Sequence, residues 1–183
     1  MRCFRIPLEH AALELDTRNR LYNEIRKSPG LHFRELQRRI SMATGALQYH
    51  LDYLEKRSLI KSERVENTKR FFAMQTKRLD GEEQIMPFLR QEKTRHLLIA
   101  MLSGRKNTIQ SLARKTQTPY STTSRLLDKI VDAGMAQKAR KRKQIHYTLE
   151  RPESIVQMLV SYRKSFLDEL VDNFVETWQE LKT

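Results

Sequence analysis

The stretch GLHFRELQRRISMATGALQYHLDYLEKRSLIKSERVENTKRFFAM, residues 30–74, decides the fold of this 183-residue chain. The three residues after the glycine, Leu31–Phe33, are mostly apolar and favour a short strand. Residues 34–40 follow with helical spacing of apolar side chains, and Ser41-Met42 suits a tight turn. Residues 43–57 then place Leu at positions 47, 51 and 54, which predicts a second helix with one buried face.

A hairpin is expected after these two helices. Ile60–Arg64 and Arg70–Met74 are strand-like segments, separated by the polar run at 65–69. A further helix is expected before the stretch, from Thr17 to the Ser28-Pro29-Gly30 stop signal. The predicted order is therefore helix, strand, helix, helix, hairpin, which is the order of a winged helix.

A second copy of this pattern lies 76 residues further along the chain. Leu21 falls on Leu97, Leu36 falls on Leu112, and Leu51-Asp52 falls on Leu127-Asp128 without a gap. We therefore expect an N-terminal segment, two copies of one unit with a linker or helix between them, and a C-terminal helix. The boundaries are 1–16, 17–75, 76–92, 93–150 and 151–183. The expected fold class is mainly α with small β-hairpins (α+β).

The quoted stretch, above all YHLDYLEKRSLI at 49–60, resembles the winged helix-turn-helix regulators of the ArsR-like group. Archaeal regulators with two such domains in tandem are similar overall. TIQSLARKTQTPYSTTSRLLDKIVDAGMAQKARKRKQIHYTL, at 108–149, carries a weaker resemblance. The resemblance implies binding of double-stranded DNA and control of transcription. The metal-sensing property of ArsR-like proteins does not transfer, because Cys3 is the single cysteine and no metal-ligand cluster is present.

In a helix-turn-helix, the second helix enters the major groove and its N-terminal residues meet base edges. We expect helices 43–57 and 119–133 in that role. The candidate base-reading residues are those that point away from the predicted cores: Thr44, Gly45, Gln48, Tyr49, Tyr120, Ser121, Thr122, Ser124 and Arg125. Gln can pair with adenine and Arg with guanine, while glycine lets the backbone approach closely.

Basic side chains on the hairpins and on the preceding helices are candidates for phosphate contacts. They are Arg64, Lys69, Arg70, Arg140, Lys141, Arg142, Lys143, Arg34, Arg38 and Arg114. The net charge is +13, and its distribution supports this prediction: residues 1–80 carry a net +7, residues 81–150 carry +8, and residues 151–183 carry −2. A regional excess of positive charge favours a polyanionic partner.

The C-terminal segment is expected to form one long helix over 153–182 with a broad apolar stripe. Six residues of the stripe are candidates for a homodimer contact: Leu159, Tyr162, Phe166, Leu170, Phe174 and Trp178. The stripe could instead pack on its own winged domain. Dimerisation is the favoured alternative.

The composition excludes several classes of protein. No apolar run approaches the ~20 residues of a membrane span, and the basic start lacks a signal-peptide core. We expect a cytoplasmic, nucleoid-associated protein that has no cofactor and is not an enzyme. The favoured function is a transcriptional repressor that binds double-stranded DNA. Two alternatives stay open: an architectural or protein-docking winged helix, and a DNA-binding protein of replication or mobile elements. The sequence is silent on any small-molecule effector.

Overall fold

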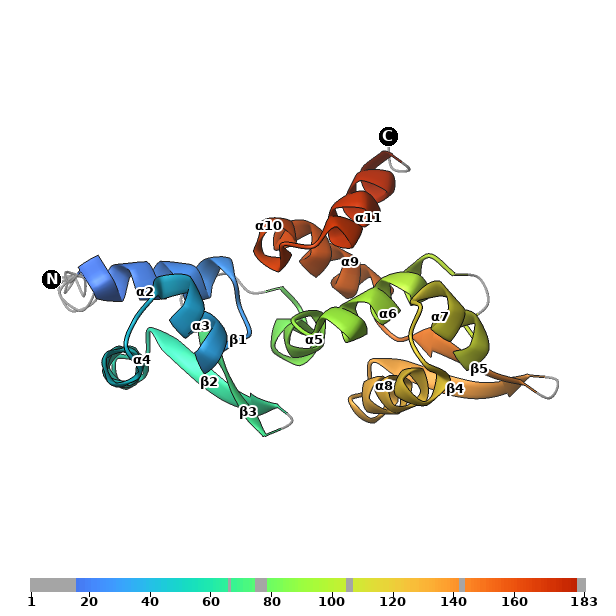
Figure 1. Ribbon diagram of the computed structural model, residues 1–183, viewed down its shortest axis with the longest axis horizontal. Helices are drawn as coiled ribbons and strands as arrows, with labels where there is room; N and C mark the ends of the chain where they lie inside the picture. Colours follow the sequence, from blue (N-terminus) through green and yellow to red (C-terminus); the bar gives the residue numbers. More distant parts are fainter. Residues whose placement is uncertain (1–15, 66, 75–78, 105–106, 142–143, 181–183) are drawn as a thin grey trace, which may run out of the picture. The chain divides into compact units, whose positions relative to one another are not determined.

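The computed structural model describes residues 16–65, 67–74, 79–104, 107–141 and 144–180, apart from the side chain of Lys141. The chain divides into two compact units, Met1–Arg78 and Leu79–Thr183. Both units are mainly helical and each contains a small antiparallel hairpin (Figure 1), which confirms the predicted fold class.

The first unit follows the predicted order of elements. They are α2 (Asp16–Lys27), β1 (Leu31–His32), α3 (Phe33–Ile40), α4 (Thr44–Lys56), β2 (Ile60–Val65) and β3 (Thr68–Ala73). The three strands form an antiparallel sheet in the order β1-β3-β2. Leu31 of β1 pairs with Phe71 of β3, so the short strand attaches the start of α3 to the hairpin.

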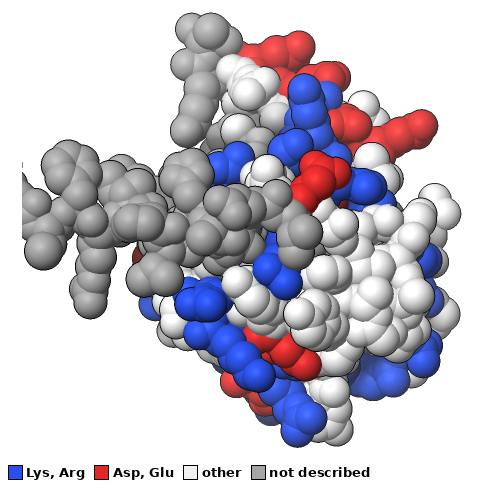
Figure 2. All heavy atoms as spheres, turned by 90° about the vertical axis from the view of Figure 1, so that its left-hand side faces the viewer, with Lys and Arg blue, Asp and Glu red and all other residues white. Residues whose placement is uncertain are grey.

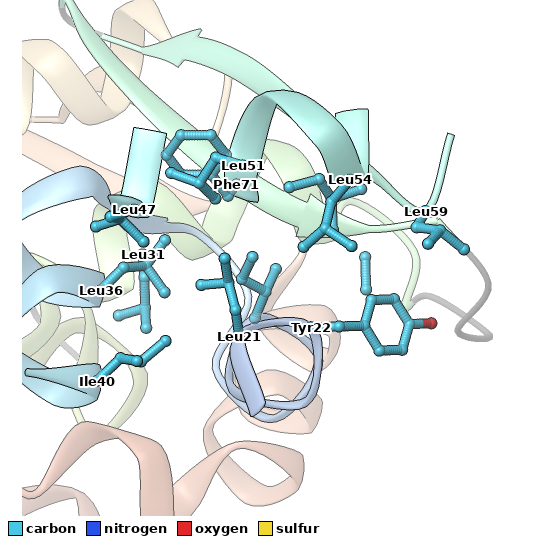
Figure 3. Packing of buried hydrophobic residues seen from close by; sticks show 13 residues of the cluster. Leu21, Tyr22, Leu31, Leu36, Ile40, Leu47, Leu51, Leu54, Leu59 and Phe71 are labelled. Carbon is cyan, nitrogen blue, oxygen red and sulfur yellow. The ribbon is translucent and has the colours of Figure 1, made fainter. Parts of the chain in front are cut away.

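The core of the first unit is made by the apolar faces that the helical spacing predicts. Leu21 and Ile25 of α2 pack with Leu36 of α3, and all three are fully buried. Figure 3 shows these side chains together with the α4 leucines and Phe71 of β3. Because α4 buries Leu47, Leu51 and Leu54, its opposite face is left toward solvent.

Specific polar contacts hold the start of α3 and the corner between α3 and α4. His32 and Glu35 form a capping box at the start of α3, in which each side chain accepts a hydrogen bond from the other residue's backbone N–H, both at 3.4 Å. Ser41 ends α3 in a left-handed conformation, with φ of 55°. The Gln37 side chain donates to Met42 O at 3.2 Å and to Thr44 Oγ1 at 2.9 Å. The two Gln37 hydrogen bonds hold the start of α4 against α3 and so fix the angle between the two helices.

The second unit contains the same order of helices and hairpin, preceded by one helix and followed by three. Its elements are α5 (Glu82–Leu89), α6 (Glu92–Leu102), α7 (Ile109–Lys115), α8 (Tyr120–Asp132), β4 (Ala136–Lys141), β5 (Gln144–Leu149), α9 (Pro152–Ser161), α10 (Arg163–Phe166) and α11 (Glu169–Glu180). Its sheet has two described strands, paired antiparallel.

Residues 76 positions apart in the two units share their burial and their backbone conformation. Buried leucines 21, 36 and 51 correspond to buried leucines 97, 112 and 127. The turn residues Ser41 and Ser58 have positive φ, and so do Gln117 and Gly134 at the corresponding positions. Tyr147 N–H donates to Asn107 O at 2.9 Å, at the place where Phe71 pairs with Leu31 in the first unit.

The C-terminal segment differs from the prediction of one long helix over 153–182. It is broken at Tyr162, between α9 and α10, and again between α10 and α11, where Leu167 adopts a left-handed conformation with φ of 53°. Phe166, just before this break, is buried, and the guanidinium of Arg90 lies 4.8 Å from the centre of its ring. Packing of the tail on its own unit therefore overrides the continuous helical periodicity.

The segment expected as a linker or helix, 76–92, is largely helical in its described part. Its described part contains α5, which packs against α6 and α9 and buries Ile85, Met86 and Leu89. Tyr162 Oη donates to Glu82 Oε2 at 2.6 Å, which attaches the start of α5 to the residue that follows α9. From Leu79 onward the chain belongs to the second unit.

Candidate nucleic-acid interface

The outward face of α4 presents the four residues predicted from the first unit. Thr44, Gly45, Gln48 and Tyr49 are all exposed, and Tyr49 keeps 60% of its surface. Two of the four side chains make hydrogen bonds inside the unit: Thr44 Oγ1 accepts the Gln37 bond, and Gln48 Nε2 donates to Asp52 Oδ1 at 2.8 Å. The Tyr49 ring lies 5.3 Å from that of His50 and 5.9 Å from the Arg18 guanidinium. A Cβ added at Gly45 would meet no atom within 4 Å, so the fold itself does not require glycine there.

The corresponding face of α8 is also accessible. Tyr120, Ser121 and Arg125 are exposed, whereas Thr122 and Ser124 are half-buried. The helix begins one residue later than its sequence signals suggest, because Pro119 is the N-cap rather than the first helical residue. The buried Thr123 hydroxyl donates back to Pro119 O at 3.1 Å, which stabilises this first turn.

Neither α4 nor α8 has an acidic residue in its first turn. Asp or Glu in that turn normally stabilises a helix through the partial positive charge of its N-terminus. Six other described helices, α2, α3, α5, α6, α9 and α11, do have an acidic residue there, whereas the short helices α7 and α10 do not. The N-termini of α4 and α8 therefore keep a field that attracts anions.

Basic side chains surround both faces. Among the phosphate candidates, five are exposed in the structure: Arg34, Arg38, Arg64, Arg114 and Arg140. Lys69 is exposed as well, but its ammonium binds Glu55 Oε2 at 2.8 Å. On the face that Figure 2 draws, Lys and Arg gather in several groups with an area of uncharged side chains between them. The pKa of His32 lies below its ordinary value, and burial is the largest cause. The nearby positive charges of Arg70, Arg38 and Arg34 lower this pKa further, whereas the negative charge of Glu35 raises it.

Arg70 corrects the phosphate prediction. It is only 5% exposed, and its Nη1 donates to Gly30 O at 2.8 Å. The guanidinium is used to hold β3 to the loop before β1, so it does not face solvent as a wing residue would. The predictions for Arg142 and Lys143 and for the side chain of Lys141 fall outside the described part of the chain.

The six apolar candidates for a dimer contact separate into two groups. Leu159 and Phe166 are buried inside the second unit, and Tyr162 is half-buried with its hydroxyl on Glu82. This corrects the expectation for Leu159 and Phe166, because their side chains are not available to a second chain, whereas the half-buried Tyr162 stays a prediction. Leu170, Phe174 and Trp178 remain at least partly exposed on α11, where the last two rings stack with centroids 5.9 Å apart.

A buried ion pair attaches α11 to α6. Arg95 Nε donates to Asp168 Oδ2 at 2.7 Å, and His96 Nε2 lies 2.8 Å from the same oxygen. Burial raises the pKa of Asp168, but the hydrogen bonds and positive charge of Arg95 and His96 outweigh burial, so its pKa lies below its ordinary value. Nothing in the sequence spacing indicated this contact between residues more than 70 positions apart.

The structure also reveals a surface hollow that the sequence prediction missed. It measures about 380 Å³ and lies where the starts of α7 and α8 meet the start of β5. Its lining residues are Thr108, Ile109, Gln110, Tyr120, Gln144 and Ile145. Only Tyr120 was among the sequence candidates. The exposed Ile145 could have been noticed from the 76-residue alignment, which places it on the basic Lys69.

Comparison with known proteins agrees with this geometry. Residues 15–84 match a family described as an N-terminal HTH domain. The chain is also 26% identical, over 148 residues, to a protein of Methanocaldococcus jannaschii named as an uncharacterized HTH-type transcriptional regulator. The match covers 81% of this chain and 36% of that protein, so the chain spans about a third of its relative's length. The first unit thus contains a helix-turn-helix, with α4 as its second helix.

No helix within the described ranges is long and apolar enough to cross a membrane. The same part of the chain contains no group of three or more His, Cys, Asp or Glu residues that could hold a metal ion.

Proposed function

We propose that the protein is a transcription regulator that binds double-stranded DNA through two winged helix-turn-helix domains, one in each unit. The observation that carries the proposal is the pair of helices α4 and α8. Each turns a leucine-containing face into its core and an exposed, acid-free N-terminal face outward, at positions 76 residues apart.

The relative supports this proposal. The 148 matched residues are more than either unit contains, so the similarity extends over parts of both. The relative's name describes an HTH-type transcriptional regulator, and we transfer that role to this chain as part of the proposal. The high net charge of +13 is the electrostatic contribution that such a protein needs on a phosphate backbone.

In the proposed complex, α4 and α8 lie in major grooves with their N-terminal turns toward base edges. Arg125, exposed on α8, reads guanine through its two-pronged guanidinium. The exposed arginines of α3 and α7 and of the two hairpins contact phosphates and fix the register. An exposed arginine that is not otherwise paired can neutralise one phosphate and release its counterions.

The proposal is tested by selecting duplexes from a random pool and then measuring affinity at several salt concentrations. The double variant Arg34→Ala/Arg38→Ala removes two exposed charges of α3. We expect weaker binding to all duplexes and a salt slope shallower by about 1.8, since each lost phosphate contact removes about 0.9. The matched control is Arg26→Ala, an exposed arginine in the last turn of α2, which should leave the slope unchanged. No enrichment of any duplex would refute the proposal.

The proposed direction of control is repression, by occupying DNA that the transcription machinery needs. The functional test is transcription in vitro from a template that carries a selected duplex at its promoter. Added protein should reduce the transcript from this template and not from one with a scrambled duplex. An increase in transcript would reverse the proposed sign without changing the DNA-binding role.

The proposed assembly is a homodimer through the outer side of α11. Leu170, Phe174 and Trp178 lie at four-residue spacing there, on the stripe next to Val171 and Val175, which are buried in the second unit. Sedimentation at micromolar concentration should show a dimer that Phe174→Ala/Trp178→Ala converts to a monomer. A wild-type monomer, with and without DNA, would contradict this assembly.

A further inference from the structure

Two exposed hydrophobic side chains meet in the hollow between α7, α8 and β5. Tyr120 keeps 60% of its surface and Ile145 keeps 46%. Large hydrophobic side chains with such exposure need an explanation when they lie together at a concave site, because the solvent-exposed apolar surface is unfavourable. Tyr120 opens α8 and Ile145 follows the first residue of β5, so both belong to the elements that the proposed function places on DNA.

Two glutamines complete the lining. Gln110 and Gln144 are exposed, and within the described ranges neither side-chain amide has a hydrogen-bond partner. Gln48 of α4 differs, since its amide already donates to Asp52. A free carboxamide offers one donor and one acceptor side by side, which is the pattern that adenine presents through N7 and its N6 amino group in the major groove.

The corresponding corner of the first unit has a different chemistry. The positions 76 residues earlier are His32, Phe33, Arg34, Thr44, Thr68 and Lys69. Arg34 and Lys69 are exposed there, and they correspond to Gln110 and Ile145. The first unit therefore presents cations at the place where the second presents an amide and an aliphatic side chain. None of the described residues that line the hollow carries a positive charge, which favours an uncharged group over a phosphate there.

We infer that this hollow is a subsite of the second unit that selects A·T base pairs. Ile145 and Tyr120 contact the C5 methyl group of thymine, and Gln110 or Gln144 pairs with the edge of adenine. This inference rests on the proposed function, and it adds a base preference that differs from the guanine contact assigned to Arg125. The major-groove edge of an A·T pair is the one base-pair surface that offers a methyl group beside an amide-like donor and acceptor.

The test uses a duplex selected from the random pool and replaces one thymine at a time by deoxyuridine, which removes only the methyl group. At one or two positions the wild-type affinity should fall about fourfold, the factor that corresponds to about 0.8 kcal/mol for one buried carbon group. The variant Ile145→Thr keeps a β-branched side chain in β5, so the strand should fold normally. It should show a smaller difference between the thymine and deoxyuridine duplexes than the wild type does, since threonine keeps one methyl group but loses the rest of the aliphatic side chain.

The amide contact is tested in the same way with 7-deazaadenine, which lacks the N7 acceptor. Gln110→Ala or Gln144→Ala should abolish the discrimination against this base. The matched control is Gln137→Ala, an exposed glutamine of the same hairpin that does not line the hollow, and it should behave as the wild type does.

The outcomes separate this inference from the proposed function. If a duplex is selected and bound, but no deoxyuridine substitution lowers affinity more than twofold, the subsite is refuted and DNA binding stands. If the loss on deoxyuridine substitution persists unchanged in Ile145→Thr, the methyl group is read elsewhere and the assignment to this hollow is wrong. If no duplex is bound, the proposed function itself is refuted.

Discussion

Gly45 gives a test in which stability and function should move in opposite directions. It is the second residue of α4, and a Cβ built on it meets no atom within 4 Å. Its backbone is helical, so alanine fits without strain. Glycine is less favourable than alanine in a helix by about 0.5–1 kcal/mol. Gly45→Ala should therefore raise the free energy of unfolding by up to about that amount.

The same substitution should weaken DNA binding. If the N-terminal turn of α4 lies in a major groove, the open space beside Gly45 is filled by a base edge or by the sugar-phosphate backbone. A methyl group placed there separates the two surfaces, and we expect at least about a tenfold loss of affinity, which equals about 1.4 kcal/mol.

Two measurements check the reasoning: thermal unfolding of the full chain, and titration of a selected duplex with the wild type and the variant. The melting temperature of the first unit should rise by about 2–8 °C. Asn19→Ala is the control, since Asn19 is an exposed polar residue of α2, a helix of the same unit that carries no candidate DNA contact. It should change affinity less than threefold. If Gly45→Ala binds as tightly as the wild type, the start of α4 does not approach DNA closely, and its role as a recognition helix is refuted.

Three further substitutions follow from the same structure. Arg125→Ala should relax the selected consensus at one position, by about 1–3 kcal/mol of lost discrimination, with a smaller effect on the salt slope; an unchanged consensus would remove it from the base-reading set. Asp168→Asn should cost about 3 kcal/mol at pH 7 in urea unfolding, because it breaks a pair whose side chains are 6% and 10% exposed. Because the pKa of Asp168 is lower in the folded protein, the ionised carboxylate stabilises the wild type at pH values above about 4, the ordinary pKa of aspartate. This contribution is lost as the pH falls below that value, so the stability of the variant should depend less on pH below about pH 4. Gly134→Ala should cost about 1 kcal/mol by thermal unfolding, since φ is 68° there and space is not limiting; an unchanged stability would show that this turn relaxes freely.

The fold of the first unit was predictable because its determinants are local. The spacing of Leu47, Leu51 and Leu54 alone decides which face of α4 is buried, and the outward residues follow by exclusion. The 76-residue spacing carried the same prediction into the second unit. Local patterns also placed the hairpins, because their strands are separated by short polar turns.

The predictions that failed depend on contacts distant in sequence. Arg70 looks like any basic hairpin residue until β3 pairs with β1 and brings Gly30 O within reach. The break at Leu167 interrupts a stripe that is helical throughout, and Asp168 after it binds Arg95 and His96 of α6. The hollow with Ile145 requires three separate elements to meet, so no single motif contains it.

The arginines at positions 18, 70 and 95 have a consequence for how variants of this chain behave. Each is less than 9% exposed, and each uses the flat geometry of its guanidinium: Arg18 stacks on Tyr53 at 3.6 Å, while Arg70 and Arg95 bind backbone carbonyl oxygens. An ammonium group is compact and strongly hydrated, and it cannot stack in this way. Exchanging these three for lysine would keep every formal charge and the isoelectric character of the protein, yet it would loosen both units from within. In this chain, the number of positive charges does not report how many of them make structural contacts through a guanidinium group. Electrophoresis and amino-acid composition measure only the number of charges.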